Sequence, residues 1–482
     1  MFWRGVWGYL PANIVQGAAG FLAIVLFTRL LSSEDFGRYA IAFSVFSLIH
    51  VAVFTWIEAA MARFWAAEFR NGQTLADHFA SLYRTAFVLI AVFVPVTVVV
   101  VWFWPMDPAF RMAVAAGLLG APARCLMKLA QERYRAAGEV SRAAALDIAF
   151  SAGGLVIGVA FAFMGAGAAS PLLGLGLAPL LTLPFILPGE LRFARNGRVD
   201  RARLRTYALY GYPIAASLAL TLVLSSTDRL LLAFFMDEAA VGAYHAAYSI
   251  ANRTLDVLFI WLGAAGAPAL VMALEQGGRE RLKEAAREQA STIILIALPA
   301  AVGLALVARP MSEFMIGEDL RAAASGVTPW IALSSLLAGC TTYYFHQAFT
   351  LGRRTGLLLL VMTVPAVANV LLNLVLIPSF GVMGAAMATT ASFGIGLLTS
   401  VTLGRRAMPL PVPWETLARA AVACAAMSAV VVNLPAMGGF AELMLKASIG
   451  GLTYAVVALI LNVAGVRDVA MRLVAQRRSQ PA

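Results

Sequence analysis

Charged residues are scarce in this sequence. Only 13% of its 482 residues are Asp, Glu, Lys or Arg, whereas a soluble domain carries about 25%. Histidine occurs four times and cysteine three times. In contrast, 61% of the residues are hydrophobic and the mean hydropathy is +0.82. This composition excludes an ordinary soluble globular protein and predicts a chain built for a lipid bilayer, with no nucleic-acid partner.

The sequence also lacks the motifs of the common enzyme classes. No lysine follows a glycine and precedes Ser or Thr, so no phosphate-binding P-loop is present. The histidines form no acyltransferase motif or metal pair, and the cysteines form no CxxC motif. No soluble stretch is long enough for a separate catalytic domain. We therefore expect a membrane transporter rather than an enzyme, with no cofactor and no metal.

Long apolar runs fill most of the chain. A helix needs about 20 apolar residues to cross the hydrocarbon core. The runs are continuous rather than alternating, which argues against a β-barrel. They predict an all-α polytopic protein with fourteen transmembrane helices, at 10–31, 37–60, 80–104, 110–130, 143–165, 169–188, 207–234, 241–272, 290–316, 326–350, 356–378, 382–403, 414–434 and 441–464.

The distribution of basic residues agrees with this count. Of the 36 Lys and Arg residues, 28 fall in segments on one side when the fourteen spans alternate. Such a bias marks the cytoplasmic side. We expect a multi-pass membrane protein with both termini in the cytoplasm. The net charge of +11 then mostly sets orientation and says little about an anionic partner.

Two short motifs repeat along the chain. Gly37-x-Tyr39 aligns with Gly242-x-Tyr244 at an offset of 205, and glycines at the ends of the fourth and tenth spans lie 214 apart. One parallel duplication explains both offsets, and the alternative is chance similarity of short motifs. We predict an N-terminal lobe at 1–190 with helices 1–6, a basic cytoplasmic linker at 191–206, a C-terminal lobe at 207–406 with helices 7–12, and an added pair of helices with a basic cytoplasmic tail at 407–482.

Three segments carry a family resemblance. They are TRLLSSEDFGRYAIAFS at 28–44, STDRLLLAFFMDEAAVGAYHAAYSIA at 226–251 and NVLLNLVLIPSFGVMGAAMAT at 369–389. In this order they resemble the polysaccharide transporter family, the O-antigen and exopolysaccharide flippases of the multidrug/oligosaccharidyl-lipid/polysaccharide exporter superfamily. The resemblance implies two six-helix lobes around a central cavity. It also implies that an undecaprenyl-pyrophosphate-linked oligosaccharide moves across the bacterial inner membrane for lipopolysaccharide, exopolysaccharide or capsule synthesis. Under the same resemblance, a polysaccharide polymerase and assembly proteins are the expected protein partners.

A few basic residues lie within the predicted spans, where a charge costs about 2.5–3.5 kcal/mol and tends to face a cavity or a partner. A guanidinium suits a pyrophosphate, so Arg253 is the first candidate for substrate binding. The alternative is an internal ion pair with Asp256, three residues on. The full candidate set for substrate binding is Arg253, Asn252, Arg29, Arg229, Arg124 and Lys128. For Arg29 and Arg229, the alternative to substrate binding is a position at the membrane interface. For Arg124 and Lys128, the alternative is a role in membrane topology alone.

Embedded carboxylates are the candidates for energy coupling. Without an ATP-binding motif, direction must come from an ion gradient or from substrate and product concentrations. Four acidic residues lie within or near spans and could carry a proton or a sodium ion: Asp256, Glu58, Asp228 and Asp147. The sequence leaves the ion open.

Other functions stay open at this point. A lipid II flippase or a multidrug/cation antiporter of the same superfamily would share the helix pattern, although the antiporter is expected to have twelve spans and an acidic cavity. An integral-membrane glycosyltransferase or acyltransferase would need an acid or histidine pair at one membrane face. A structural protein of the polysaccharide assembly machinery would have an empty apolar interior.

Overall fold

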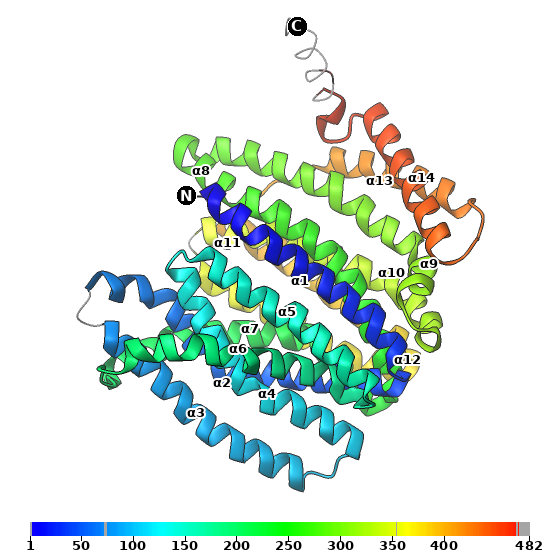
Figure 1. Cartoon of the computed structure of the whole chain (residues 1–482). Coiled ribbons are helices and arrows are strands. Elements are labelled where there is room, and N and C mark those ends of the chain that lie inside the picture. The colour runs from blue at the N-terminus through cyan, green and yellow to red at the C-terminus, as the bar shows by residue number, and fades with distance from the viewer. Residues whose placement is uncertain (1, 72–74, 353, 469–470, 472–482) are drawn as a thin grey trace, which may run out of the picture. The chain divides into compact units, whose positions relative to one another are not determined.

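The computed structural model describes residues 2–71, 75–352, 354–468 and 471. All regular elements in these residues are helical, and no strand occurs among them. A bilayer core offers no water to the backbone, so a spanning segment must satisfy its own amide and carbonyl groups, as a helix does. The predicted all-α polytopic fold is confirmed (Figure 1).

The helices follow one another with short connections. The first half of the chain contains α1 (Phe2–Leu30), α2 (Ser33–Asn71), α3 (Leu75–Phe103), α4 (Pro108–Ala136), α5 (Val140–Phe163), η1 (Gly167–Ala169), α6 (Ser170–Ala194) and α7 (Arg201–Phe235). The second half contains α8 (Glu238–Leu306), α9 (Ala308–Met315), α10 (Glu318–Cys340), η2 (Thr341–Phe345), α11 (Gln347–Leu351), α12 (Thr355–Ala407), α13 (Trp414–Val432), α14 (Gly439–Ile460) and η3 (Val463–Gly465).

Twelve described segments are long and apolar enough to cross a membrane. Two of them, α8 and α12, contain a glycine with non-helical backbone angles, Gly278 and Gly381. In α8 a side chain at Gly266 would collide with Gln289. A straight helix would hold these residues about 35 Å apart, so α8 is a hairpin. Fourteen crossings remain a prediction, which is met if each arm of α8 and α12 crosses separately.

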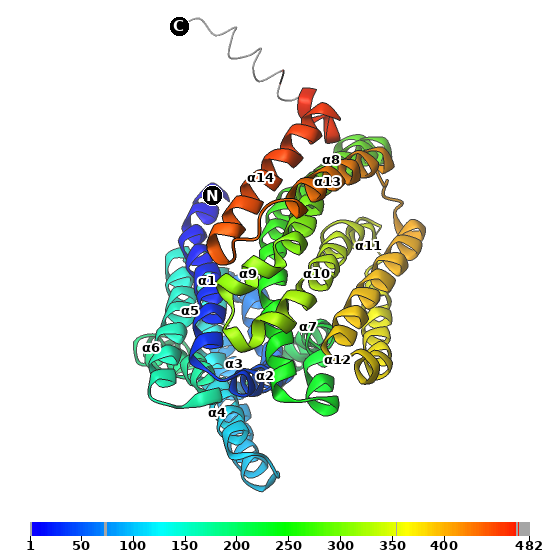
Figure 2. The ribbon, with the colours of Figure 1, turned by 90° about the vertical axis from the view of Figure 1, so that its right-hand side faces the viewer.

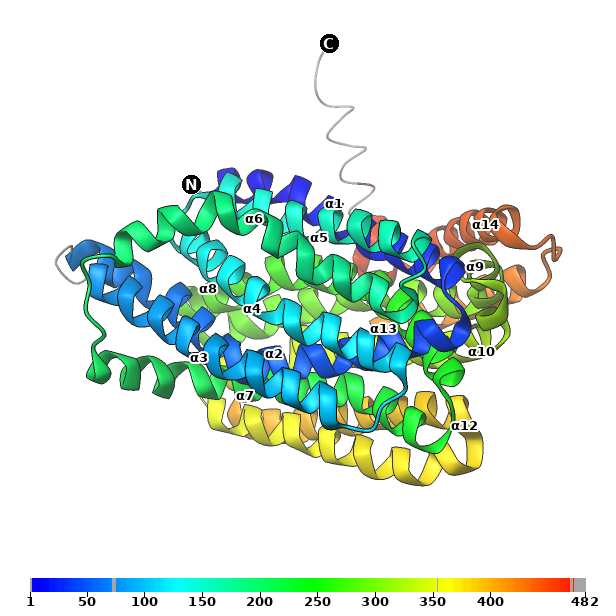
Figure 3. The ribbon, with the colours of Figure 1, turned by 60° about the horizontal axis from the view of Figure 1, so that its bottom comes forward.

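The chain forms two compact units, Met1–Gly242 and Ala243–Ala482. In the first unit α2 packs against α4 and α7, α6 packs against α4 and α5, and α1 packs against α5. Figure 3 shows α2, α3, α4 and α6 side by side. Fully buried aromatic and aliphatic side chains fill the space between α2, α3 and α4, among them Phe54, Ile57, Phe79 and Leu129.

Small residues allow the closest helix approaches in this unit. Gly120 of α4 and Gly176 of α6 face each other, and a Cβ atom on either would press on the other's Cα. Gly174 of α6 likewise leaves no room for a side chain beside the Gly154 carbonyl of α5. Helices in lipid associate through such close packing because hydrophobic burial gives them little driving force.

Helix α7 belongs to the first unit by its contacts. Tyr212 stacks on Trp56 of α2 with ring centroids 5.2 Å apart. Arg203 forms an ion pair with Glu68 of α2 at 2.8 Å. The predicted linker at 191–206 is mostly helical, since only 195–200 lies between the end of α6 and the start of α7. The predicted lobe boundaries remain a prediction.

The second unit is organised around the arms of α8 and α12. Helices α13 and α14 pack together and against the second arm of α8 (Figure 2). The Tyr454 hydroxyl of α14 donates to the Leu295 carbonyl oxygen at 2.8 Å. Helix α10 packs on α12, where the Thr390 hydroxyl donates to the Trp330 carbonyl oxygen at 3.0 Å. The predicted C-terminal helix pair is therefore present as α13 and α14.

The reversal in α8 makes a prediction about Gly278. Its backbone angles, φ 64° and ψ −151°, belong to a region almost restricted to glycine. We expect Gly278→Ala to lower the free energy of unfolding by about 1–3 kcal/mol, because no neighbouring atom would meet the added Cβ and only the backbone is strained. Gly303→Ala, at a helical position in the same segment with equal space, should be neutral or stabilising. Thermal unfolding in detergent checks this, and equal melting temperatures for the two variants would contradict it.

Candidate functional site

Two predicted site residues, Glu58 and Arg124, lie in one cluster inside the first unit. Glu58 is near the middle of α2, and the His50 Nε2 donates to its Oε1 at 3.0 Å. Both side chains are buried, with 6% of each residue exposed. Glu58 also acts electrostatically on the Arg124 guanidinium of α4. We call His50, Glu58 and Arg124 the N-terminal cluster.

The Arg124 guanidinium is held by aromatic rings rather than by a carboxylate. Its Cζ lies 4.4 Å from the ring centroid of Phe150 on α5 and 5.7 Å from that of Phe46 on α2. A cation over an aromatic face is stabilised by the ring quadrupole. Within the part of the chain that the structure describes, Arg124 forms no ion pair, so its hydrogen-bond donors are available to an anion.

The N-terminal cluster therefore offers two kinds of chemistry. The Arg124 fork can bind a phosphate or pyrophosphate through paired hydrogen bonds. His50 and Glu58 form a buried hydrogen-bonded pair, and the Nδ1 atom of His50 has no further hydrogen-bond partner among the described residues.

Lys128 and Asp147 lie elsewhere, in a network of ion pairs where α4 meets α5. Lys128 pairs with Glu132 at 3.2 Å, and Arg135 joins Glu132 to Asp147 at 3.0 and 2.9 Å. Because each charge in this network faces an opposite charge, the geometry favours a structural role for Lys128 and Asp147.

The same end of the unit contains a second, more deeply buried set of ion pairs. Arg133 of α4 bonds Glu190 of α6 at 2.6 Å and also reaches Glu139. Glu190 is 1% exposed and accepts a further hydrogen bond from the Tyr83 hydroxyl of α3 at 3.2 Å. This set ties together the ends of three helices.

The candidates in the first arm of α8 do not form the ion pair between Arg253 and Asp256 that was the alternative to substrate binding. Asp256 accepts a hydrogen bond from the Asn252 amide at 2.6 Å, and the Ser335 hydroxyl of α10 donates to Asn252 at 3.1 Å. Arg253 is exposed, and no ion pair joins it to Asp256 in the described structure. Arg253 therefore makes no direct ion pair with Asp256, although the two opposite charges interact electrostatically.

The remaining candidates lie near helix ends. Arg29 is exposed in the last turn of α1. Asp228 and Arg229 are buried near the end of α7, where Arg229 donates to the Ser226 hydroxyl at 3.5 Å.

Comparison with known proteins identifies the family to which this chain belongs. Residues 26–325 match the model of a family described as polysaccharide biosynthesis protein, which is more than half of the chain. The chain belongs to this family. The matched part of this polysaccharide biosynthesis protein contains the whole N-terminal cluster and the candidates of α8.

Relatives and solved structures agree with the family. A probable flippase, AglR of Haloferax volcanii, is 24% identical over 320 residues, which are 64% of this chain and 62% of that protein. A lipid II flippase, MurJ in an inward closed conformation, has the same fold with a TM-score of 0.74 at 14% identity, covering 96% of this chain and 99% of that one. An inward-facing multidrug transporter of the MATE family gives 0.62 at 15% identity, covering 81% and 94%. The expected superfamily fold is confirmed.

Sequence reasoning missed several members of these sites. His50 was considered only as a possible enzyme residue, although it shares the predicted span 37–60 with Glu58. Two polar residues in one apolar span would have indicated a pair. Arg133, Glu190 and Tyr83 come from three separate helices, and no spacing along the chain links them.

The buried Arg133 pair predicts a large effect on stability. Arg133→Ala would leave the Glu190 carboxylate buried with only the Tyr83 hydrogen bond, and breaking such a pair costs about 3–5 kcal/mol. Arg142→Ala removes an arginine whose side chain is 68% exposed and should cost less than about 1 kcal/mol. Denaturation in detergent measures both, and equal losses would contradict the structural role of Arg133.

Proposed function

We propose that this polysaccharide biosynthesis protein is a flippase. In this proposal it carries an undecaprenyl-pyrophosphate-linked oligosaccharide across the inner membrane by alternating access of two lobes. The product would serve O-antigen, exopolysaccharide or capsule synthesis, beside a polymerase and assembly proteins. Family membership and a fold shared with lipid and drug transporters support the proposal. The observation that carries it is the Arg124 guanidinium, which lies within the helices with no ion-pair partner in the described chain.

Arg124 and Arg253 would bind the substrate in this scheme. Both are cations on predicted spans, and neither is paired with a carboxylate in the described chain. A guanidinium matches two phosphate oxygens at once, which a pyrophosphate supplies. Arg29, Arg229 and Asn252 would make weaker contacts, and Lys128 would act through the ion-pair network.

The His50–Glu58 pair would couple transport to a proton gradient. The buried Glu58 carboxylate can lose its charge only by binding a proton. Protonation would change the free-energy cost of keeping this side chain buried beside Arg124 and His50. Asp256, Asp228 and Asp147 are the other acidic candidates. Asp147 already has an ion-pair partner, and Asp256 accepts a hydrogen bond from Asn252. Both termini would lie in the cytoplasm, as the distribution of basic residues indicates.

The two arginines give the first functional test. Arg124→Gln and Arg253→Ala should each reduce export of surface polysaccharide in cells at least about tenfold, the loss of one charge-assisted hydrogen bond, while the amount of protein in the membrane is unchanged. Arg124→Lys keeps the charge and should retain partial export. Arg287→Ala removes the same charge from an exposed position of helix α8 and should leave export intact. Normal export by both arginine variants would overturn their assignment.

Glu58 gives a test of the coupling. Glu58→Gln keeps a hydrogen-bonding group for His50 but cannot ionise. In proteoliposomes with an imposed pH gradient, we expect the wild-type protein to flip lipid-linked saccharide faster than without the gradient, and Glu58→Gln to show equal rates in both conditions. Asp147→Asn serves as the control and should keep the gradient dependence. A Glu58→Gln protein that still responds to the gradient would exclude this residue as the proton carrier.

A further inference from the structure

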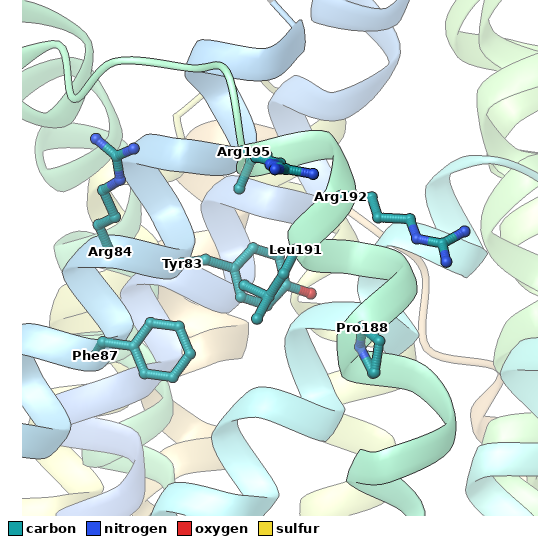
Figure 4. Close-up of a pocket in the computed structure, with 8 residues that line it drawn as sticks. Tyr83, Arg84, Phe87, Pro188, Leu191, Arg192 and Arg195 are labelled. Carbon is teal, nitrogen blue, oxygen red and sulfur yellow. The ribbon is translucent and has the colours of Figure 1, made fainter.

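A hollow of about 440 Å³ lies between α3 and α6, away from the N-terminal cluster. Three arginines line it: Arg84 of α3, and Arg192 and Arg195 at the end of α6. Figure 4 shows Arg84 and Arg195 at one end, Phe87 and Pro188 at the other, and Tyr83 and Leu191 between them.

The positive charge of this hollow is not neutralised locally. All three arginines are exposed, and none forms an ion pair in the part of the chain that the structure covers. The nearest buried carboxylate, Glu190, is already bonded to Arg133 and Tyr83. The fully buried Tyr83 side chain lies at the bottom of the hollow. Among the described residues, the hollow therefore has three arginines without an ion-pair partner around its rim, with Arg84 and Arg192 on opposite sides in Figure 4.

An apolar groove continues from this hollow. It has a volume of about 530 Å³ and lies between α3, α4 and α6, lined by side chains such as Met112, Leu119 and Leu180. Phe87 lines both spaces, so the groove begins where the cationic hollow ends. The surface beside it is strongly apolar, with Val88 63% and Leu181 62% exposed, as expected of a face toward lipid.

We propose that the two spaces together bind one anionic phospholipid. The phosphate would accept hydrogen bonds from Arg84, Arg192 and Arg195, and one acyl chain would lie in the groove past Phe87. Basic pockets between transmembrane helices are known to hold anionic headgroups. The groove has the size of a pocket for a small ligand, within about 300–1,000 Å³, and it lies on an exposed face, which favours a membrane phospholipid over a polyprenyl substrate.

Lipid binding to the full-length protein tests the site. The protein, purified in detergent, is titrated with dioleoyl phosphatidylglycerol or dioleoyl phosphatidylcholine, and bound lipid is counted by native mass spectrometry. The wild type should bind one phosphatidylglycerol in preference to phosphatidylcholine. The variant with Arg84→Gln, Arg192→Gln and Arg195→Gln should lose that preference and bind at least about tenfold more weakly, given the attraction contributed by each arginine near the surface.

Three controls make the result decisive. Arg198→Gln, Arg201→Gln and Arg205→Gln together remove the same charge from the neighbouring exposed stretch and should leave binding unchanged. Ala115→Phe places a ring in the groove and should weaken phosphatidylglycerol binding while the three arginines remain. Equal loss in both arginine triples, or displacement of phosphatidylglycerol by undecaprenyl pyrophosphate at lower concentration, would overturn the proposal. Because the assay measures binding and not flipping, its outcome is independent of the proposed function.

Discussion

A charge inside a membrane helix costs about 2.5–3.5 kcal/mol unless a partner or water stabilises it, and this constraint sorts the few charges of the chain. At one end of the first unit, Arg133, Glu190 and Glu139 neutralise one another and join α4 to α6. Lys128 and Asp147 are balanced in the same way through Glu132 and Arg135. Arg124 and Arg253 are candidate arginines that form no ion pair in the described structure. Because an unpaired charge within a membrane helix is unfavourable, these two positions are the strongest candidates for a functional role.

Glycine sets the geometry within which these charges lie. Gly37 and Gly242, the equivalent positions of the repeated motif, pack against each other at the starts of α2 and α8. A Cβ atom at Gly37 would overlap the Glu238 backbone, and one at Gly242 would press on Ser33. Both copies of the motif therefore place a glycine where the starts of α2 and α8 approach closely. The reversals at Gly278 and Gly381 depend on the same residue type for a different reason, positive φ.

Much of this could be predicted from one sequence. Length and continuity of the apolar runs predict the all-α fold, since hydrophobicity and helix length follow from the bilayer alone. The two arms of α8 were predicted as separate spans, 241–272 and 290–316, and the structure joins them through Gly278. The hydrogen-bond partners of individual side chains were harder to predict. The spacing of Arg253 and Asp256 allows an ion pair, but Asp256 accepts its hydrogen bond from Asn252 of the same helix. The bond from Ser335 of α10 to Asn252 could not be predicted, because a partner from another helix leaves no trace in local periodicity.

The central claim is transport of a pyrophosphate-linked saccharide, and a reconstituted flipping assay tests it most directly. Purified protein in proteoliposomes would be offered undecaprenyl-pyrophosphate-linked oligosaccharide, lipid II or a cationic drug, and transbilayer movement of each would be measured. Our account predicts movement of the oligosaccharide lipid that is lost in Arg124→Gln, little movement of lipid II and none of the drug. Transport of the drug or of lipid II alone, or movement of the oligosaccharide lipid unchanged by Arg124→Gln, would contradict it.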